Sequence, residues 1–364
     1  MREFHVCPHE PLQRFAVALF RAVGADVDIA EEVARHLVNA NLSGHDSHGV
    51  IRIAQYFDQI AKGALRPNAR PEIIQGTSVT ALIDGHKGMG HFVTSFALDW
   101  AIRQAGQHGL AAAAIRHASH IGRLGDYTER AAARGVIAIL TVGVGGPGLG
   151  GVVLFGSRQR FLGTNPWSIS IPAEGRPPMV FDGASSAVAE GKVRLAHSKG
   201  LALPEGAIVD AEGRATTNPE DFYRGGGLLP LGGSVAGHKG YGLAMASMLL
   251  SALAMIDDPE PFLWASSQVE LQDRRGRAGG VFLLIVDPRQ FGDPTHYQAM
   301  VAEVLSAAKR APRAAGVDEI LVPGEPEVKM RERRSREGIS IPDATWRELS
   351  LLAERFGLPL PPTE

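Results

Sequence analysis

The segment "SGHDSHGVIR" gathers five polar side chains within a short stretch, and such a density suggests a binding site. They are His45, Asp46, Ser47, His48 and Arg52. Hydroxyl, imidazole and guanidinium donors at the start of a helix suit a carboxylate, which accepts hydrogen bonds from all three. The spacing of His45 and His48 also permits a metal site, although no HExxH pattern or convincing third ligand accompanies it. A third interpretation makes these residues the solvated start of a helix, with Asp46 or Ser47 as its cap.

A second polar group, in "RHASHIGRLGDY", follows an apolar segment. His117 and His120 lie where a strand over 110–118 is predicted to end, and strand ends often line the sites of α/β proteins. Histidine transfers protons near neutral pH, and oxidation of an alcohol needs such a base while hydride leaves the carbon. Structural histidines with hydrogen-bonded rings would explain the same residues equally well.

The run from Gly143 to Gly148 has the G-x-G-x-x-G spelling of a dinucleotide-binding fingerprint. A true fingerprint closes a strand, opens a helix and has an acidic residue about 20 positions later. The apolar segment 136–142 supplies the strand, but β-branched residues interrupted by glycine and proline follow the run, and 130–173 contains no Asp or Glu. We therefore predict a flexible loop at 143–151 and no Rossmann fold.

Three further segments place small or charged residues where a ligand could approach the backbone. They are "GTNPWSISIP", "FDGASSAVAEGK" and "GHKGYG". Glycine and serine allow a flat ring or a phosphate to come close, and turn chemistry alone would also explain them. Lys239 is predicted in the first turn of a helix, where the helix dipole disfavours a cation.

The composition excludes several classes of function. The chain has 364 residues, is 45% hydrophobic and 21% charged, and carries a formal net charge of −2, as a soluble globular protein does. This balance shows no excess of basic residues of the kind that would attract nucleic acid or an anionic membrane. Cys7 is the single cysteine, so we expect a reducing compartment, the cytoplasm. We also expect neither a signal peptide nor a membrane span.

The apolar periodicity predicts an α/β protein in which helices precede and follow an alternating region. A helix over 28–42 begins with a capping-box pattern at Asp28 and Glu31, and another covers 49–63. The helix over 239–256 is apolar nearly all round and is predicted to be buried. We expect a mixed sheet in the middle of the chain and a helical domain formed by the two ends. Strands are predicted at 79–85, 110–118, 135–142, 179–183 and 280–288, and further helices at 91–109, 123–134 and 186–200.

Five ordered motifs give the chain a family resemblance. They are "NANLSGHDSHGVIR", "SHIGRLGDY", "FLGTNPW", "GHKGYGLA" and "LVPGEPEVKMRERRSREGI". Together they resemble the malate/L-lactate dehydrogenase family over nearly the whole chain, and residues 185–219 look most like its hydroxycarboxylate dehydrogenase B branch. The resemblance implies a non-Rossmann α/β fold with a largely antiparallel sheet. It divides the chain into a helical region (1–72), a nicotinamide-binding domain (73–310) and a segment that returns to the helical region (311–364).

The resemblance also implies an NAD(P)-dependent oxidoreductase that interconverts a 2-hydroxy acid and its 2-oxo acid. It makes His120, with Asp182, catalytic, and it places Ser47, His48 and Arg52 at the substrate. NAD is the expected cofactor, NADP is possible, no metal is required, and the expected assembly is a homodimer. The cofactor contacts that it implies are His48, Gly122, Arg123, Leu124, Val180, Phe181, Asp182, Gly183, Ala184, His238, Lys239, Gly324, Glu325, Pro326 and Glu327.

The chain departs from the family pattern in two places, and three other functions stay open. The glycine run replaces a stretch that carries a polar substrate contact near Val144, and "FDGASS" replaces the usual "FDMATS". Substrate choice is therefore open, and a cyclic-imine reductase is the alternative within the family. A metal-dependent hydrolase on His45 and His48 and a catalytically idle nucleotide-binding relative are the alternatives outside it.

Overall fold

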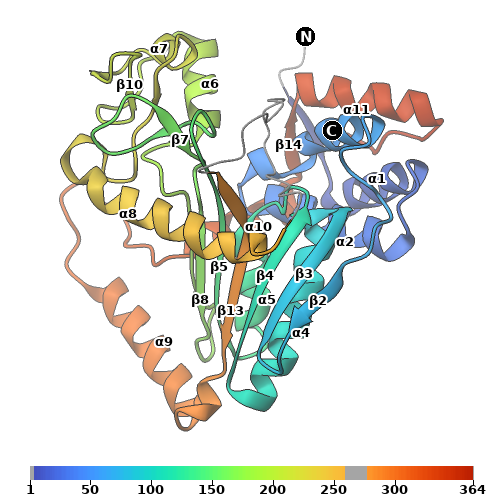
Figure 1. Ribbon diagram of the computed structural model, residues 1–364. Helices are drawn as coiled ribbons and strands as arrows, with labels where there is room; N and C mark the ends of the chain where they lie inside the picture. The colour runs from blue at the N-terminus through green and yellow to red at the C-terminus, as the bar shows by residue number, and fades with distance from the viewer. Residues whose placement is uncertain (1–3, 259–276, 364) are drawn as a thin grey trace.

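The computed structural model describes residues 4–258 and 277–363, and it is built around one large sheet (Figure 1). The strands of this sheet are β2 (Glu72–Gly76), β3 (Thr80–Gly88), β4 (Leu110–Ala118), β5 (Ile137–Gly145), β6 (Val152–Val153), β7 (Arg160–Leu162), β8 (Trp167–Ile171), β9 (Met179–Gly183), β10 (Ile208–Val209), β11 (Ala215–Thr216), β12 (Gly227–Leu228) and β13 (Ala278–Val286). Their order is β11-β10-β12-β6-β7-β5-β13-β4-β3-β2, and β8 pairs with both β5 and β9. Only β3–β4 and β12–β6 are parallel among these described pairs, which confirms a mixed, largely antiparallel sheet.

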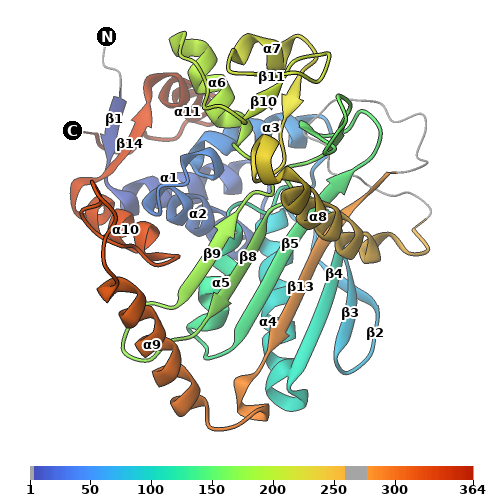
Figure 2. The same cartoon turned by 90° about the vertical axis from the view of Figure 1, so that its left-hand side faces the viewer.

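Helices surround the sheet. They are α1 (His9–Ala22), α2 (Val27–Leu42), α3 (Ile53–Ala61), α4 (Gly90–His108), α5 (Leu124–Ala132), α6 (Glu190–Lys199), α7 (Pro219–Tyr223), α8 (Gly233–Ser251), α9 (Pro294–Arg310), α10 (Glu325–Glu337) and α11 (Asp343–Phe356), with short 3-10 turns η1 (Asp46–His48), η2 (Val50–Arg52), η3 (Ala252–Met255) and η4 (Pro288–Gln290). Helices α4 and α5 cover one face of the sheet, and α8 crosses the other (Figure 2). Buried alanines on α4 and β4 allow helix and sheet to approach closely.

The two ends of the chain form one helical lobe, as the sequence predicts. The strand β1 (Phe4–Cys7) pairs antiparallel with β14 (Ile339–Pro342). One apolar core joins Phe15, Leu37 and Tyr56 of the N-terminal helices to Trp346 and Leu349 of α11. Because α9 lies beside the sheet, away from this core, the C-terminal segment that returns to the lobe consists of α10, β14 and α11 (Figure 1).

Two predicted helix starts are wrong in detail. Helix α2 begins at Val27 after Asp26, and neither member of the expected capping box at Asp28 and Glu31 caps it. The helix predicted over 49–63 is regular only from Ile53, because the two 3-10 turns η1 and η2 precede it. These tighter turns project His48 and Arg52 from irregular backbone rather than from a helix face.

The segment predicted as a loop at 143–151 begins in a strand: residues 143–145 belong to β5, and 146–151 form turns and irregular backbone. Strand β5 continues through Gly145, which pairs with Ala278 on one side and Leu162 on the other. The glycines are needed because α8 lies directly on the strand, and a Cβ at Gly143 would lie 2.4 Å from the Cα of Met248. The prediction that no Rossmann helix follows is confirmed, since the run leads into the short strands β6 and β7.

We expect Gly143→Ala to destabilise the protein by about 1–3 kcal/mol, because overpacking against backbone atoms forces strand and helix apart. Gly106→Ala is the matched control, because its Cβ would meet only the end of the Arg289 side chain at 3.5 Å. That control should be neutral or stabilising by about 0.5–1 kcal/mol, as alanine is the better helix former. Chemical denaturation of both variants measures the difference, and equal stabilities would contradict the close strand–helix contact.

The apolar helix predicted to be buried is exposed on one side. Helix α8 is assigned from Gly233, but its backbone is non-helical at Ala236, so Lys239 stands in the first turn of the segment that follows this kink, as predicted. Its side chains Leu243 and Leu249 are 47% and 57% exposed. Some of the apolar side chains of α8 are therefore exposed on the surface of the single chain.

Candidate active site

A cavity of about 500 Å³ lies between the helical lobe, the sheet and the start of α6, and its volume is within the range of small-molecule sites. The helical lobe contributes η1, η2 and the first turn of α3, and the sheet contributes the ends of β4, β5 and β13. Its walls are Ser47, His48, Arg52, Gln55, Ile115–Leu124 without Arg123, Val142–Val144, Thr164–Pro166, Ala189–Gly191, Arg194, Met255, Asp258 and Gly279–Val281. The cavity therefore unites the two polar segments that the sequence singled out.

His120 lies at the cavity wall with its ring held by a tyrosine. The hydroxyl of Tyr56 is 2.7 Å from His120 Nδ1, and Tyr56 is fully buried. The ring of His48 stacks on that of His120 with 5.4 Å between centroids and 20° between planes. The Tyr56 contact fixes the orientation of the imidazole at the cavity wall, where a ligand can exchange a proton with the ring.

Arg52 reaches the same cavity, and two neutral oxygens fix its position. Its Nε donates to the backbone carbonyl of Ser47 at 2.6 Å, and its Nη1 donates to Gln55 Oε1 at 2.7 Å. The hydroxyl of Ser47 lies 3.0 Å from His48 Nδ1. Within residues 4–258 and 277–363, no carboxylate lies within ion-pair distance of Arg52. A partly exposed cation at a cavity wall, with no carboxylate partner among the described residues, favours an anionic ligand.

Burial and the nearby arginine keep the site histidines neutral. Burial lowers the pKa of His48 to about 3, and the positive charge of Arg52 contributes in the same direction. The pKa of His120 is well below its usual range for the same causes, again with burial first. Both rings are therefore neutral bases in the free cavity at neutral pH.

His117, the other histidine of this segment, is held between two carboxylates. Its Nδ1 lies 2.9 Å from Asp84 Oδ2, and its Nε2 lies 3.1 Å from Asp258 Oδ2. Arg116 Nε lies 3.0 Å from the same Asp84 carboxylate. The backbone of His117 adopts φ 50°, a left-handed conformation that costs free energy in a non-glycine residue. Because both ring nitrogens face carboxylates, we interpret His117 as part of the wall and His120 as the reactive histidine.

The residues around the predicted cofactor motif divide between the cavity and the core. Gly122 and Leu124 line the cavity, whereas Arg123 is 2% exposed and turns inward. The guanidinium of Arg123 lies 2.7 Å from Glu129 Oε1 and 3.6 Å from Asp182 Oδ2. Asp182 accepts the N–H of Gly125 at 2.7 Å, in the first turn of α5.

Asp182, for which a catalytic role is predicted, does not line the cavity. Burial raises the pKa of the Asp182 carboxyl, while the charge of Arg123 opposes this effect. The carboxylate does not line the cavity, so its position favours a structural role at α5 and its catalytic role stays a prediction.

The other predicted cofactor residues lie outside the walls of this cavity. They are Val180, Phe181, Gly183 and Ala184 on or after β9, His238 and Lys239 on α8, and Gly324 with Glu325, Pro326 and Glu327 at the start of α10. The residues on β9 lie next to those at the start of α10, since the N–H of Val180 donates to the carbonyl of Pro323 at 3.1 Å. The ring of His238 meets that of Phe155 edge-on, with 5.7 Å between centroids. Their contact with a cofactor stays a prediction.

Metal binding at His45 and His48 finds no support in the geometry. His45 Nε2 is 3.1 Å from Glu327 Oε1, and His48 lies on the ligand cavity with Ser47. In the described part of the chain, Glu32, His36 and Asp126 are the one group with metal-like spacing. Arginines already hold its carboxylates, because Arg35 binds both Glu32 and Asp126.

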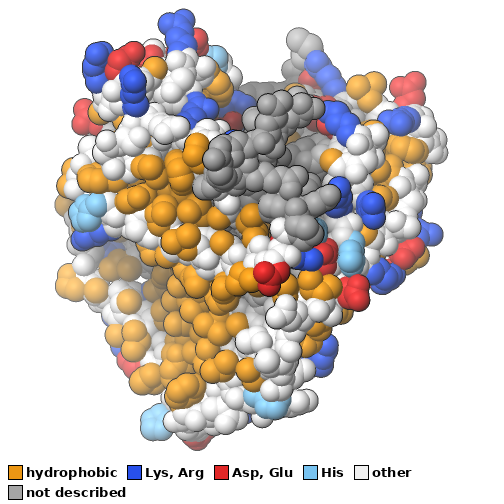
Figure 3. Space-filling model, in the orientation of Figure 1, with side chains coloured by type: hydrophobic (Ala, Val, Ile, Leu, Met, Phe, Trp, Pro, Cys, Tyr) orange, Lys and Arg blue, Asp and Glu red, His pale blue; other side chains and the backbone are white. Residues whose placement is uncertain are grey.

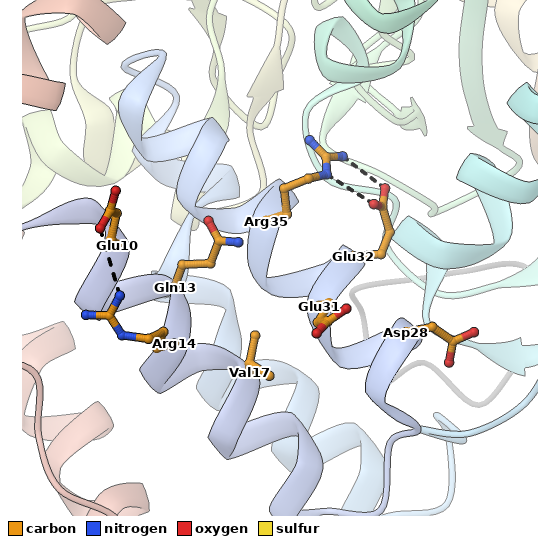
Figure 4. Close-up of a pocket in the computed structure, with 8 residues that line it drawn as sticks. All are labelled: Glu10, Gln13, Arg14, Val17, Asp28, Glu31, Glu32 and Arg35. Atoms are coloured by element: carbon orange, nitrogen blue, oxygen red, sulfur yellow. Dashed lines mark hydrogen bonds and ion pairs between the residues drawn. The ribbon is translucent and has the colours of Figure 1, made fainter.

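A second hollow, of about 680 Å³, lies between α1 and α2 (Figure 4). Two ion pairs lie within it, Glu32 with Arg35 at 2.9 Å and Glu10 with Arg14 at 3.9 Å. The hollow contains no histidine, serine or cysteine. The cavity at His120 joins a histidine, a serine and an arginine that has no carboxylate partner among the described residues, so this cavity is the candidate active site.

Comparison with known proteins decides the family. The model of the malate/L-lactate dehydrogenase family matches residues 7–350. The chain belongs to this family. It is 32% identical to hydroxycarboxylate dehydrogenase B of Escherichia coli K12 over 99% of this chain and 96% of that protein. Malate dehydrogenase from Entamoeba histolytica superimposes with a TM-score of 0.90 at 28% identity, covering 98% of this chain and 99% of that one.

A third similar protein is the sulfolactate dehydrogenase from Methanocaldococcus jannaschii. Its structure has a TM-score of 0.86 at 29% identity and covers 98% of each chain. As a malate/L-lactate dehydrogenase family member, this protein is an oxidoreductase that interconverts a 2-hydroxy acid and its 2-oxo acid. No helix in the described residues is long and apolar enough to cross a membrane.

Two residues of the dehydrogenase site were missed from the sequence. Tyr56 and Gln55 follow Arg52 in the first turn of α3, and they hold His120 and Arg52 respectively. The spacing of Arg52 and Tyr56, one helical turn apart, could have shown that both face the same side.

Proposed function

We propose that Arg52 and Ser47 bind the carboxylate of the 2-hydroxy or 2-oxo acid and that His120 transfers the proton at the C2 oxygen. The unbalanced charge of Arg52 beside the neutral ring of His120 is the observation that carries this proposal. An ion-paired arginine would offer no comparable site, and a charged histidine could not accept a proton.

In the oxidative direction, the carboxylate holds the substrate against Arg52 so that its hydroxyl faces His120. Neutral His120 accepts the hydroxyl proton at Nε2 as the C–H bond at C2 breaks. In the reductive direction, protonated His120 returns this proton to the carbonyl oxygen. A bound nicotinamide supplies or receives the hydride at C2. Tyr56 keeps the imidazole oriented through Nδ1, so the chain contributes placement and charge complementarity.

The cavity has room for a nicotinamide ring. Its volume is about 500 Å³, and its walls include the backbone of Gly122, Gly143, Gly279 and Gly280. The ring would lie against these glycines and His48. The adenosine end would extend toward β9, His238, Lys239 and the start of α10, as the family pattern implies. We propose NAD as the cofactor.

Oxidation of NADH and of NADPH with a panel of 2-oxo acids and one cyclic imino acid tests this function. We expect turnover of a 2-oxo acid. The cofactor that gives the higher rate, NADH or NADPH, is the one for which the enzyme is specific. Turnover of the imino acid alone would favour the cyclic-imine reductase instead. Cofactor binding without turnover of any compound would favour the idle relative, and stoichiometric metal with hydrolysis would favour the hydrolase.

We also propose a cytoplasmic homodimer. The partner would cover the apolar surface on α8 and the sheet face beside it (Figure 3). This surface includes Leu243, Leu249 and Leu253, and Met300 and Val304 on α9 are exposed as well, all at least 43%. Monomers rarely expose so large an apolar patch. Light scattering should give twice the 38.7 kDa mass of one chain, and a monomer at all concentrations would contradict the proposal.

A further inference from the structure

We propose that Arg334 of α10 is a positioning residue for the substrate site, because it holds the turn η1 that carries Ser47 and His48. The inference rests on the proposed function and goes further, since it gives a task to a helix of the C-terminal segment. Arg334 lies outside the described walls of the cavity, so it acts on the site through Asp46, the first residue of η1.

The turn η1 has little support of its own. It is three residues long, and all three of its residues are partly or fully exposed. The N–H of His48 donates to the carbonyl of His45 at 2.9 Å. The N–H of Gly49 donates to the carbonyl of Asp46 at 3.1 Å, and such 3-10 bonds have poorer geometry than those of an α-helix. The positions of Ser47 and His48 therefore depend on the side chains around the turn.

Arg334 and Asn41 supply this support. The two terminal nitrogens of Arg334 donate to the two carboxylate oxygens of Asp46 at 2.7 and 3.0 Å, and Nη1 also donates to the backbone carbonyl of Asn41. The side-chain amide of Asn41 donates to Asp46 Oδ1 at 2.7 Å, and its own Oδ1 accepts the N–H of Val50 at 2.9 Å. A two-pronged pair of arginine and carboxylate fixes direction as well as distance. The turn is therefore held at Asp46, its first residue, and at Val50, where η2 begins.

This support reaches the carboxylate site through the backbone of η1. The carbonyl of Ser47, the residue after Asp46, accepts the Nε–H of Arg52 at 2.6 Å. The hydroxyl of Ser47 lies 3.0 Å from His48 Nδ1. A shift of Asp46 would therefore displace both the carbonyl that orients Arg52 and the hydroxyl beside it. Because Arg52 also donates to Gln55 Oε1 on α3, the loss of this anchor should misplace the cation rather than remove it.

Helix α10 has anchors that do not depend on Arg334. Arg331, one turn earlier, donates to Glu129 Oε2 on α5 at 2.7 Å. At the start of the helix, Glu327 Oε1 lies 3.1 Å from His45 Nε2. The helix also lies against α2 (Figure 2). Shortening the Arg334 side chain should therefore loosen η1 without detaching α10.

Steady-state kinetics of Arg334→Met test the positioning role. We expect kcat/KM for the best 2-oxo acid to fall by about 10- to 100-fold, mainly through a higher KM, because the carboxylate site loses its alignment. The Kd for NADH, measured by fluorescence titration, should change little. Arg334→Lys should recover only part of the loss, since an ammonium group cannot hold both carboxylate oxygens in a fork.

Arg331→Met is the matched control. It removes an ion pair to Glu129 and a hydrogen bond to the Ser43 hydroxyl from the same helix, and it leaves Asp46 with Arg334. Both variants should lower the melting temperature, whereas only Arg334→Met should raise KM. A double-mutant cycle adds a second criterion: once Asp46 is replaced in Asp46→Ala, Arg334→Met should lower kcat/KM little further, because the two side chains act as one unit.

Hydrogen exchange tests the position of the turn without turnover. The N–H groups of His48 and Gly49 bond within η1, and that of Val50 bonds to Asn41 Oδ1. These amides should exchange faster in Arg334→Met than in wild type, and Arg331→Met should match wild type. If Arg334→Met does not fold, Arg334→Lys takes its place in each comparison.

The outcomes separate the positioning role from the proposed function. A KM for the 2-oxo acid that is unchanged in Arg334→Met, or raised equally in Arg331→Met, overturns the positioning role while the dehydrogenase function stands. Unchanged exchange at residues 48–50 in Arg334→Met overturns it as well. No turnover of any 2-oxo acid by the wild type overturns the proposed function and the positioning role with it. A higher KM together with faster exchange, both confined to Arg334→Met, supports the proposal.

Discussion

His120→Asn is expected to lower kcat by a factor of about 10²–10⁴, because the variant loses the group that transfers the proton to or from the C2 oxygen. The affinity for NADH should change little, since the ring is held by Tyr56 at the wall of the cavity rather than built into the core. Steady-state kinetics with the best 2-oxo acid, together with fluorescence titration of NADH, measure both quantities.

The control for this result is His117→Asn, because His117 lies on the same strand end but has both ring nitrogens facing carboxylates. Its effect on kcat should be much smaller, and any loss should be accompanied by a lower melting temperature. Near-normal turnover in His120→Asn, or a larger loss in His117→Asn at unchanged stability, would contradict the assignment of the reactive histidine.

The second large effect is expected for Arg52→Met, which removes the cation without a large change in volume. Breaking a buried charge-assisted contact costs about 2–5 kcal/mol, so kcat/KM should fall by about 30- to 4,000-fold. Most of the loss should appear in KM, with a further loss in kcat if the contact tightens in the transition state. Arg52→Lys should recover only part of the activity, because an ammonium group cannot reproduce the two-pronged geometry of a guanidinium.

Arg194→Met is the comparison for the carboxylate site, since Arg194 lines the opposite wall on α6. We expect a much smaller rise in KM from this variant. A severe loss in Arg194→Met with little change in Arg52→Met would place the carboxylate on the other wall.

The residues of the site could be predicted where they fall within one short motif. The contacts between segments that are distant in the sequence were harder to predict. The segments around His48 and His120 were recognisable because each presents several polar groups beside an apolar element. Their position in one cavity depends on long-range packing of the helical lobe against the sheet, which periodicity does not encode. Tyr56 was missed because a buried tyrosine in an amphipathic helix looks like an ordinary core residue.

The fold shows the same limit. The alternation of strands and helices was visible, whereas the glycines at Gly143 and Gly145 looked like a loop, because the helix that requires them, α8, is about a hundred residues away. Helix α8 looked like a core helix because its apolar composition does not reveal which of its side chains stay exposed in the single chain.

The central claim is that this cavity passes a hydride between a nicotinamide and C2 of a carboxylic acid that Arg52 and His120 hold. The most direct test uses reduced cofactor that carries deuterium at the transferable position, with mass spectrometry of the product formed from the best 2-oxo acid. The account predicts a 2-hydroxy acid with a single deuterium at C2, formed far more slowly by His120→Asn. A product without deuterium at C2, or cofactor oxidation without a 2-hydroxy acid, would contradict it.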